Sequence, residues 1–502
     1  MLRVVLLATL SAFIAMWWVW DSRSRADKVS IAVARLEHDN SGQYEDLLAE
    51  ALHNVPNLHM IRVGRIRIPD LDQPDEAERA GHEAAHNRLK RVRADALIWG
   101  SVVRRGDETR VMLRWTPAPD LAVARDFGRY ETANDLTLPP LLWNDLNPVL
   151  RLLVATYAVD VRGLEAREAA DAFFPFVVPV YDTLAKPSEG TWSAATGARI
   201  APVLANALFR YAEQTGQNQL LDDAVTIYRD VLATYARWQQ PLDWALAESH
   251  LGAALATLGE WASDPMRLEQ AVNAFRAALW EQTPERTPLE WAKTQMNIGN
   301  ALTTLGALGA QNTTPPRLED AVIAYRAALT DEARELMPLA WSATQNSLGN
   351  VLKALGDLKV DPIRMEEAVT AYRAALTVGT RKLMPLQWAT VQSNLASALA
   401  RSGEARSDPA RLKEAVRAYR AALKERPREQ MPLVWAATQN NLGNALRTLG
   451  HIESDTAQME KAAVAYTSAL AEFTRAKSES QIEMTRRNLE RTLKTLNERT
   501  KS

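Results

Sequence analysis

The 502-residue chain contains no cysteine, which excludes disulfides, thiolate zinc sites, iron–sulfur clusters and a cysteine nucleophile. It has almost no charge excess, with 59 basic against 61 acidic residues, so no global basic field is present to hold nucleic acid. The patterns GxxxxGK[ST], GxSxG and GxGxxG, typical of phosphate sites, serine nucleophiles and dinucleotide sites, do not occur. With 47% hydrophobic and 24% charged residues, the composition is that of a globular protein.

One long uncharged run stands near the N-terminus, from Val4 to Trp20. As a helix it would span about 26 Å, and Arg3 and Arg23 can snorkel to the headgroups to cover the rest of a bilayer core. Its three tryptophans cluster at one end, as in an interfacial belt. We predict an uncleaved transmembrane anchor over residues 1–27. The alternatives are a cleaved signal peptide ending at Ser24-Arg25-Ala26 and a buried or mis-started segment.

The orientation of this anchor stays open, because basic residues flank it on both sides. Arg23, Arg25 and Lys28 favour a cytoplasmic C-terminal side by the positive-inside rule. The orientation usual for N-terminal anchors in bacterial proteins, which this chain resembles, would instead place the C-terminal side outside the cytoplasm. We expect an inner-membrane protein with a single pass, and we favour the periplasm for its soluble part.

A small α/β domain is predicted over residues 28–135. Period-two alternation indicates strands, and 3.6-residue spacing indicates helices. The expected strands are Val29–Ala34, Leu58–Val63 and a hairpin within Ala94–Trp115, and the expected helices are Tyr44–His53 and Glu76–Val92.

Two stretches of this domain resemble the N-terminal domain of TolB and its relatives, which recur beside repeat modules in bacterial proteins. They are ADALIWGSVVRRGDETRVMLRW and, more weakly, VSIAVARLEHDNSGQYEDLLAEAL. The resemblance covers about 100 residues. The first strand departs from the family's apolar-Pro-Phe ending, because Arg35 and Leu36 stand there. The resemblance implies binding and assembly and supplies no catalytic residues.

His82-Glu83-Ala84-Ala85-His86 matches the HExxH pattern of zinc hydrolases. On a helix the two histidines would share one face, and Glu83 would be the general base. No third ligand follows at a familiar spacing, and Asn87-Arg88 replaces the usual apolar continuation. We therefore predict a solvated helix face, with zinc hydrolysis as the alternative.

The second half of the chain repeats itself after a helical connector over residues 136–193. The motif Pro-Leu-x-Trp-Ala begins at Pro241, Pro288, Pro338, Pro385 and Pro432, with spacings of 47, 50, 47 and 47. A divergent earlier copy precedes these five, so six repeats are predicted over residues 194–480. The segment 481–502 imitates a first helix alone, which predicts a C-terminal capping helix.

Each repeat is predicted to be a pair of helices. Proline of the motif suits the first turn of the first helix, and Asp264, Asp361 and Asp408 suit the N-cap of the second. We expect glycines to close the first helices; these are Gly259, Gly306, Gly356, Gly403 and Gly450. We expect each motif tryptophan to bury its ring against the preceding second helix.

The pattern NNLGNAL…G…A…AY…AL resembles tetratricopeptide repeats over about 300 residues. Leu442, Gly443 and Gly450 match that family's first helix, and Ala271, Phe275 and Ala278 match its second. The period is 47 instead of 34, which looks closest to kinesin-light-chain-like repeats. The resemblance implies a mainly α fold, a right-handed α-α superhelix, whose first helices line a concave face.

Amides and basic residues recur on the predicted concave face. They are Lys293, Asn297, Asn300, Asn346, Asn350, Lys353, Asn394, Asn440, Asn441, Asn444 and Arg447. A side-chain amide both donates and accepts, so a ladder of amides would hold an extended peptide without reading its sequence. The alternative is that the amides bond only to neighbouring repeats.

The sequence thus favours a membrane-anchored protein-interaction scaffold without catalysis. Its expected partner is a protein or peptide, with no cofactor, no metal, no nucleic acid and no small-molecule substrate. The alternative is a metal-dependent hydrolase that uses the HEAAH segment.

Overall fold

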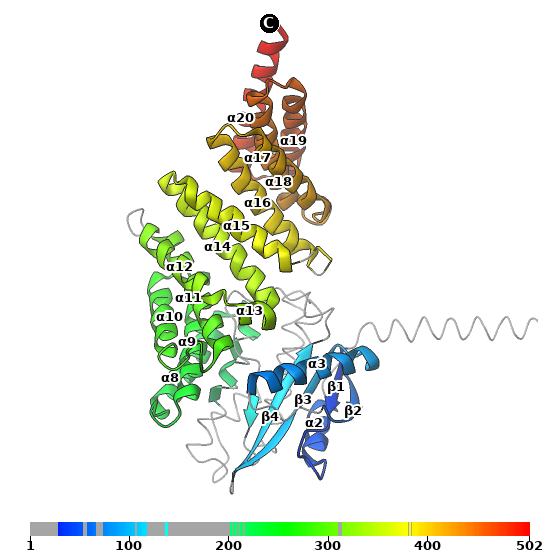
Figure 1. The fold of residues 1–502 in the computed structure, drawn as a ribbon, viewed down its shortest axis with the longest axis vertical. Helices are drawn as coiled ribbons and strands as arrows, with labels where there is room; N and C mark the ends of the chain where they lie inside the picture. Colours follow the sequence, from blue (N-terminus) through cyan, green and yellow to red (C-terminus); the bar gives the residue numbers. More distant parts are fainter. Residues whose placement is uncertain are drawn as a thin grey trace, which may run out of the picture. The chain divides into compact units, whose positions relative to one another are not determined.

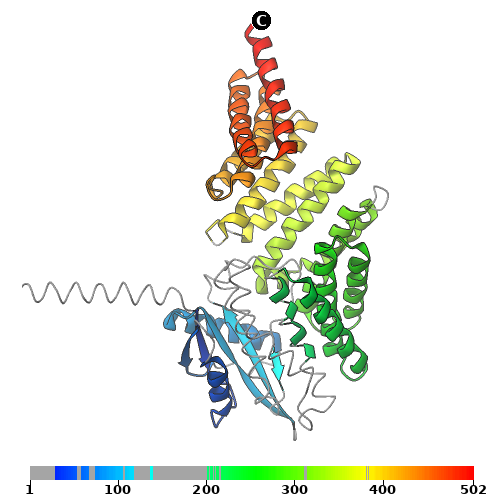
Figure 2. The same ribbon diagram turned by 180° about the vertical axis from the view of Figure 1, so that it is seen from behind.

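The computed structural model describes residues 29–53, 58–66, 74–105, 108–117, 136–138, 201–309 except 203, 207, 210, 214 and 215, 314–379, 381–382 and 384–501. The chain divides into two compact units, residues 1–281 and 282–502, and the boundary falls within the repeats. The fold is mainly helical, with a small sheet near the N-terminus (Figures 1 and 2). The predicted anchor and almost all of the predicted connector lie outside the described residues. No described helix is both long and apolar enough to cross a membrane.

The sheet has five strands in the order β2-β1-β3-β4-β5. β1 (Val29–Ala34) pairs in parallel with β2 (Leu58–Val63) and with β3 (Ala96–Arg105). β3 and β4 (Glu108–Pro117) form the predicted hairpin, in register from Ala96↔Pro117 to Arg105↔Glu108. The short β5 (Leu136–Leu138) joins β4 just beyond the predicted boundary at residue 135.

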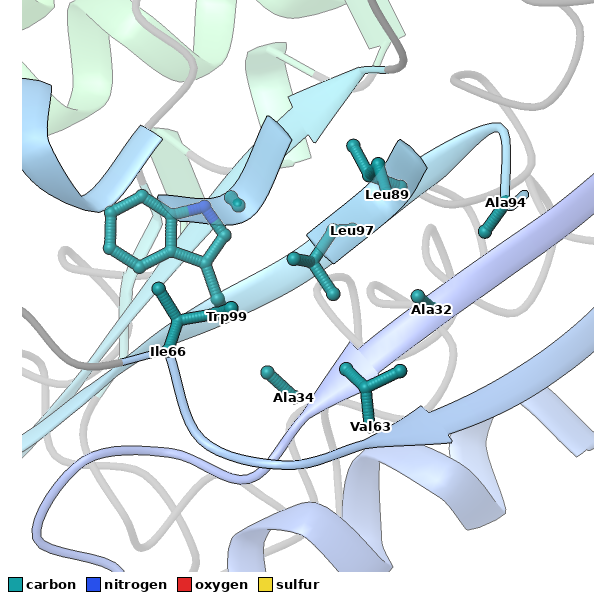
Figure 3. Close-up of a cluster of buried hydrophobic side chains, with 9 residues drawn as sticks. Ala32, Ala34, Val63, Ile66, Leu89, Ala94, Leu97 and Trp99 are labelled. Atoms are coloured by element: carbon teal, nitrogen blue, oxygen red, sulfur yellow. The ribbon is translucent and has the colours of Figure 1, made fainter. Parts of the chain in front are cut away.

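The helices α2 (Gln43–His53) and α3 (Pro74–Val92) connect the three parallel strands, as their sequence periods predict. Ala85 and Leu89 of α3 pack with Ala34, Leu97 and Trp99 of the sheet (Figure 3). Gly81 makes this packing possible, because a Cβ there would lie 2.2 Å from the Trp99 ring.

The repeats are helix pairs, and we call the first helix of each pair helix A and the second helix B. Helix A is α9 (Pro241–Trp261), α11 (Pro288–Leu308), α14 (Pro338–Lys359), α16 (Pro385–Ala405) and α18 (Pro432–Ile452). Helix B is α10 (Pro265–Ala278), α12 (Thr314–Ala328), α15 (Pro362–Val378), α17 (Pro409–Lys424) and α19 (Thr456–Arg475). The helix α8 (Asn218–Thr234) is the helix B of the divergent first copy, and α13 (Asp331–Leu336) is a short extra helix. Within residues 282–502, successive helices A and B pack against each other along the chain, and the short α13 packs on α11 and α14 (Figure 1).

The helix starts follow the sequence prediction. Each motif proline is the first residue of its helix A. The carboxylates of Asp264, Asp361 and Asp408 accept hydrogen bonds from the backbone N–H groups two and three residues ahead, which is N-capping. Asp455 caps α19 in the same way, without a following proline.

The prediction that glycines close the helices A is wrong. Each helix A continues for two or three residues past its glycine, for example to Trp261 beyond Gly259. Gly259, Gly403 and Gly450 serve close packing instead; a Cβ on Gly450, for example, would lie 2.8 Å from a side-chain atom of Met459 in helix B.

The last helix, α20 (Glu479–Lys501), packs against α19 like a helix A without its helix B (Figure 2). Thr485 and Asn488 donate hydrogen bonds to Asn440 and Asn444 of α18. Glu490 stands where α18 has Gly443, whose absent side chain admits the Tyr466 ring. A further helix B therefore cannot approach α20 in the way that α19 approaches α18.

Candidate functional site: the face of the helices A

The helices α14, α16 and α18 present equivalent faces to solvent. Ala343, Thr390 and Ala437 occupy the same position in three successive repeats, and all three are exposed. We call the surface formed by these three residues and the nearby amides the A-face. The amides are Asn346, Asn350, Asn394, Asn441 and Asn444, which are partly or fully exposed. The predicted binding residues on α14, α16 and α18 lie on or just behind it.

Buried tyrosines of the helices B hydrogen-bond to asparagines of the helices A. The hydroxyl groups of Tyr325, Tyr372 and Tyr466 donate hydrogen bonds of 2.7 Å to the Oδ1 atoms of Asn300, Asn350 and Asn444. In the repeat between the last two, Ser397 replaces asparagine and bonds to Tyr419. Burial raises the pKa of Tyr466 to about 12, and raises those of Tyr372 and Tyr419 further still. The phenols therefore stay protonated and remain donors across the physiological range.

Other amides connect neighbouring repeats. Asn394 Nδ2 donates to Asn346 Oδ1 at 3.0 Å, from α16 to α14. Asn440 donates to Asn441 at 3.4 Å and accepts from Thr485 of α20. These contacts are the ones the structural alternative expects.

Two of the predicted basic residues are engaged within the fold. Lys353 Nζ lies 2.6 Å from Asp357 Oδ2, and Arg401 Nε lies 3.1 Å from Oδ1 of the same carboxylate. Burial alone would raise the pKa of Asp357, but the bonds and charges of Lys353 and Arg401 hold it below its usual value. Arg447 hydrogen-bonds to the Tyr466 phenol.

The structure brings some predicted residues together and separates others. Asn346 meets Asn394, and Asn440, Asn441, Asn444 and Arg447 gather on α18. Asn297 is fully buried and Asn300 nearly so, while Asn350 is exposed and Lys293 partly exposed. The A-face therefore begins at α14, and α11 offers little of its amide row to solvent.

The motif tryptophans differ from the prediction. Trp341 is buried, but Trp244, Trp291, Trp388 and Trp435 are only partly covered. Trp435 packs against a cluster that includes Ala469 and Phe473 of α19, the helix B of its own repeat.

A guanidinium covers four of these rings. Arg237, Arg334, Arg381 and Arg428, each seven residues before a motif tryptophan, lie 5.0–5.7 Å from the ring centroids. Three of these arginines also hydrogen-bond to a glutamate at the end of helix B, the bonds being Arg237–Glu281, Arg381–Glu425 and Arg428–Glu472. The recurring Arg-x6-Trp spacing is visible in the sequence, although these arginines were not among the predicted residues.

The HEAAH segment is not a wholly solvated helix face, contrary to the prediction. His82 Nδ1 lies 2.8 Å from Thr116 Oγ1, and its ring meets Trp99 edge-on at 5.1 Å between centroids. Trp99 Nε1 donates to the same hydroxyl at 2.7 Å, so His82 belongs to a polar contact between α3 and the sheet. Among the described residues, no three His, Cys, Asp or Glu side chains are grouped to hold a metal ion.

Comparisons with known proteins add little to this geometry. No family model matches the chain, and no curated protein matches it. A solved circular tandem repeat protein, described as having a novel repeat topology and enhanced subunit contact surfaces, is similar at 14% identity and a TM-score of 0.25. The alignment covers 71% of this chain and 96% of that one.

Proposed function

We propose that this protein is a protein-interaction scaffold whose A-face binds an extended segment of a partner. A helical tandem repeat suits this role, because it stacks equivalent positions into a long continuous surface. The observation that carries the proposal is the row of small exposed residues, Ala343, Thr390 and Ala437, in three successive helices A. Small side chains leave room for a bound backbone.

The tyrosine bonds define what the amides can offer a partner. Oδ1 of Asn350 is engaged by Tyr372, while its Nδ2 group makes no hydrogen bond to a described residue. The amide therefore presents donors, and a partner's backbone carbonyl is a suitable acceptor. Binding and structural roles are compatible in this arrangement, since each amide has two ends.

We infer an array of the tetratricopeptide type, a TolB-like α/β domain that docks a second partner, and an inner-membrane anchor at residues 4–20. We favour the periplasm for the soluble part. The protein acts by binding and performs no reaction, and the contacts of His82 with Thr116 and Trp99 support this over a zinc site.

The test is partner capture by the full chain in its native membrane. Ala437→Arg and Ala343→Arg add bulk to the A-face at exposed helix positions, where arginine is a good helix former. Val464→Arg adds the same side chain to the exposed side of α19 and is the control. We expect a specific partner that is lost with both A-face variants and kept with the control. Equal recovery with all three variants would contradict the proposal.

A further inference from the structure

Arg426 is a buried cation at the junction of two repeats. It follows α17, and only 6% of its surface is exposed. Its Nη1 donates to Thr438 Oγ1 of α18 at 2.8 Å, and its Nη2 donates to Thr390 Oγ1 of α16 at 3.0 Å. Both hydroxyls donate in turn to carbonyls of their own helices, so they face the guanidinium as acceptors.

No carboxylate among the described residues pairs with this guanidinium. Glu425, its neighbour in the chain, hydrogen-bonds to Arg381 at 2.6 Å. Glu472 of the next repeat is held by Arg428 and Arg475. Burial lowers the pKa of Arg426 with no opposing carboxylate, yet arginine stays charged in proteins. A buried charge without a counter-charge is costly, and two neutral hydroxyls compensate it only in part.

The same chain shows that this position does not need a charge. Gln282 is the equivalent residue after α10, and it is also buried. Its Oε1 accepts a hydrogen bond of 2.7 Å from Thr294, which is the equivalent of Thr438. A neutral amide thus occupies this position in another repeat and bonds to the equivalent threonine. The charge of Arg426 exceeds what this structural role requires.

We propose that Arg426 is an anion-binding site that takes a carboxylate or phosphate group. The guanidinium contacts Thr390, which is exposed on the A-face, so a segment lying on that face would bring its acidic group next to the guanidinium. Three of the five guanidinium N–H groups donate to no described residue and are available to an oxyanion. The inference rests on the proposed function for its biological ligand, which we expect to be an acidic segment.

The test uses inorganic phosphate on the full chain, with sodium chloride balancing ionic strength, and follows the thermal midpoint. Phosphate also stabilises proteins in general, so the comparison between variants is the measurement. Arg426→Gln installs the residue of position 282, and Arg417→Gln removes an exposed arginine of α17 as the control. We expect the phosphate-dependent rise in midpoint to be larger by several degrees in the wild type and in Arg417→Gln than in Arg426→Gln. An equal rise in all three would overturn the proposal.

A second variant keeps the test decisive if Arg426→Gln does not fold. Thr390→Glu places a carboxylate next to the guanidinium at an exposed position, so it should raise the midpoint and abolish the specific phosphate response. A retained response would overturn the proposal. A parallel series with sodium acetate shows whether carboxylates bind as phosphate does. Neither series depends on capturing a partner, so failure of this site and failure of the scaffold function are distinguishable.

Discussion

The hydroxyl of Tyr372 donates a 2.7 Å hydrogen bond to Oδ1 of Asn350, across the two helices of one repeat. The tyrosine is fully buried and the asparagine is exposed, so the bond joins the core to the A-face. Gly349 lets the ring approach, since a Cβ there would lie 2.6 Å from it. The same bond recurs at Asn300 and Asn444, which makes it a property of the repeat.

Breaking this bond should destabilise the array without removing a hydrophobic contact. Tyr372→Phe removes the donor, and we expect a loss of about 1 kcal/mol in unfolding free energy. Asn350→Ala leaves the buried hydroxyl without its acceptor, and we expect about 1–2 kcal/mol. The double variant should cost less than the sum, as measured by urea unfolding. Strictly additive losses would show that the bond contributes nothing.

Among the arginine–glutamate pairs beside the motif tryptophans, we expect Arg428–Glu472 to stabilise the fold most, because the carboxylate of Glu472 is buried. Its side chain is 0% exposed and bonds to Arg428 and Arg475, whereas Glu425 beside Arg381 is 16% exposed. Arg428→Ala leaves a buried charge poorly paired, and we expect a loss of about 2–3 kcal/mol. Arg381→Ala is the matched control and should cost about 1 kcal/mol or less, because water screens its partner. Equal losses in thermal unfolding would contradict this ranking.

Glu248 should make stability depend on pH. Burial raises its pKa from 4.5 to about 7. The folded state therefore holds a proton that the unfolded state releases, so its contribution is complete below pH 4.5 and is lost as pH rises towards 7. Because the group is only half buried, we expect a decrease of about 1–2 kcal/mol across that window.

The other repeats show which neutral residue can replace Glu248 in a control variant. Glutamine occupies the equivalent position at Gln295, Gln345, Gln392 and Gln439. In Glu248→Gln the decrease between pH 4.5 and 7 should disappear, measured as the difference in urea midpoint from the wild type. A pH profile identical to that of the wild type would refute the assignment.

Val360 is strained at the end of α14. Its φ of 51° lies in the left-handed region, which disfavours β-branched residues, and its side chain is 86% exposed. Ser263, Ser407 and Ser454 hold the same conformation in other repeats. Val360→Asn should stabilise the protein by about 0.5–1 kcal/mol, because asparagine tolerates this region. Val464→Asn, within a helix, should not stabilise it, and a gain there in thermal unfolding would point to reduced surface hydrophobicity instead.

The helices and strands could be predicted from the sequence where the spacing of apolar residues along a short segment determines them. The strands β1 and β2 have the predicted bounds, and α2 begins one residue before its prediction. The N-caps at Asp264, Asp361 and Asp408 followed from local sequence, because capping involves only the next three residues.

The contacts between helices were not predictable in the same way. Asn350 and Tyr372 lie 22 residues apart on different helices, and their meeting depends on how closely Gly349 lets those helices approach. The sequence does not show how closely two helices approach, so Gly450 was predicted to end its helix. It lies inside α18 and packs against Met459. The charge of Arg426 is visible in the sequence, but its burial without a carboxylate is visible only in the fold.

The most direct test of the scaffold account is site-specific photo-crosslinking in native membranes. A photoreactive phenylalanine analogue at Thr390 or Ala437 samples the A-face, and the same group at Val464 samples the exposed side of α19. The account predicts a discrete adduct with one partner from both A-face positions and none from Val464. Adducts from Val464 alone, or from none of the three positions, would contradict binding at the A-face.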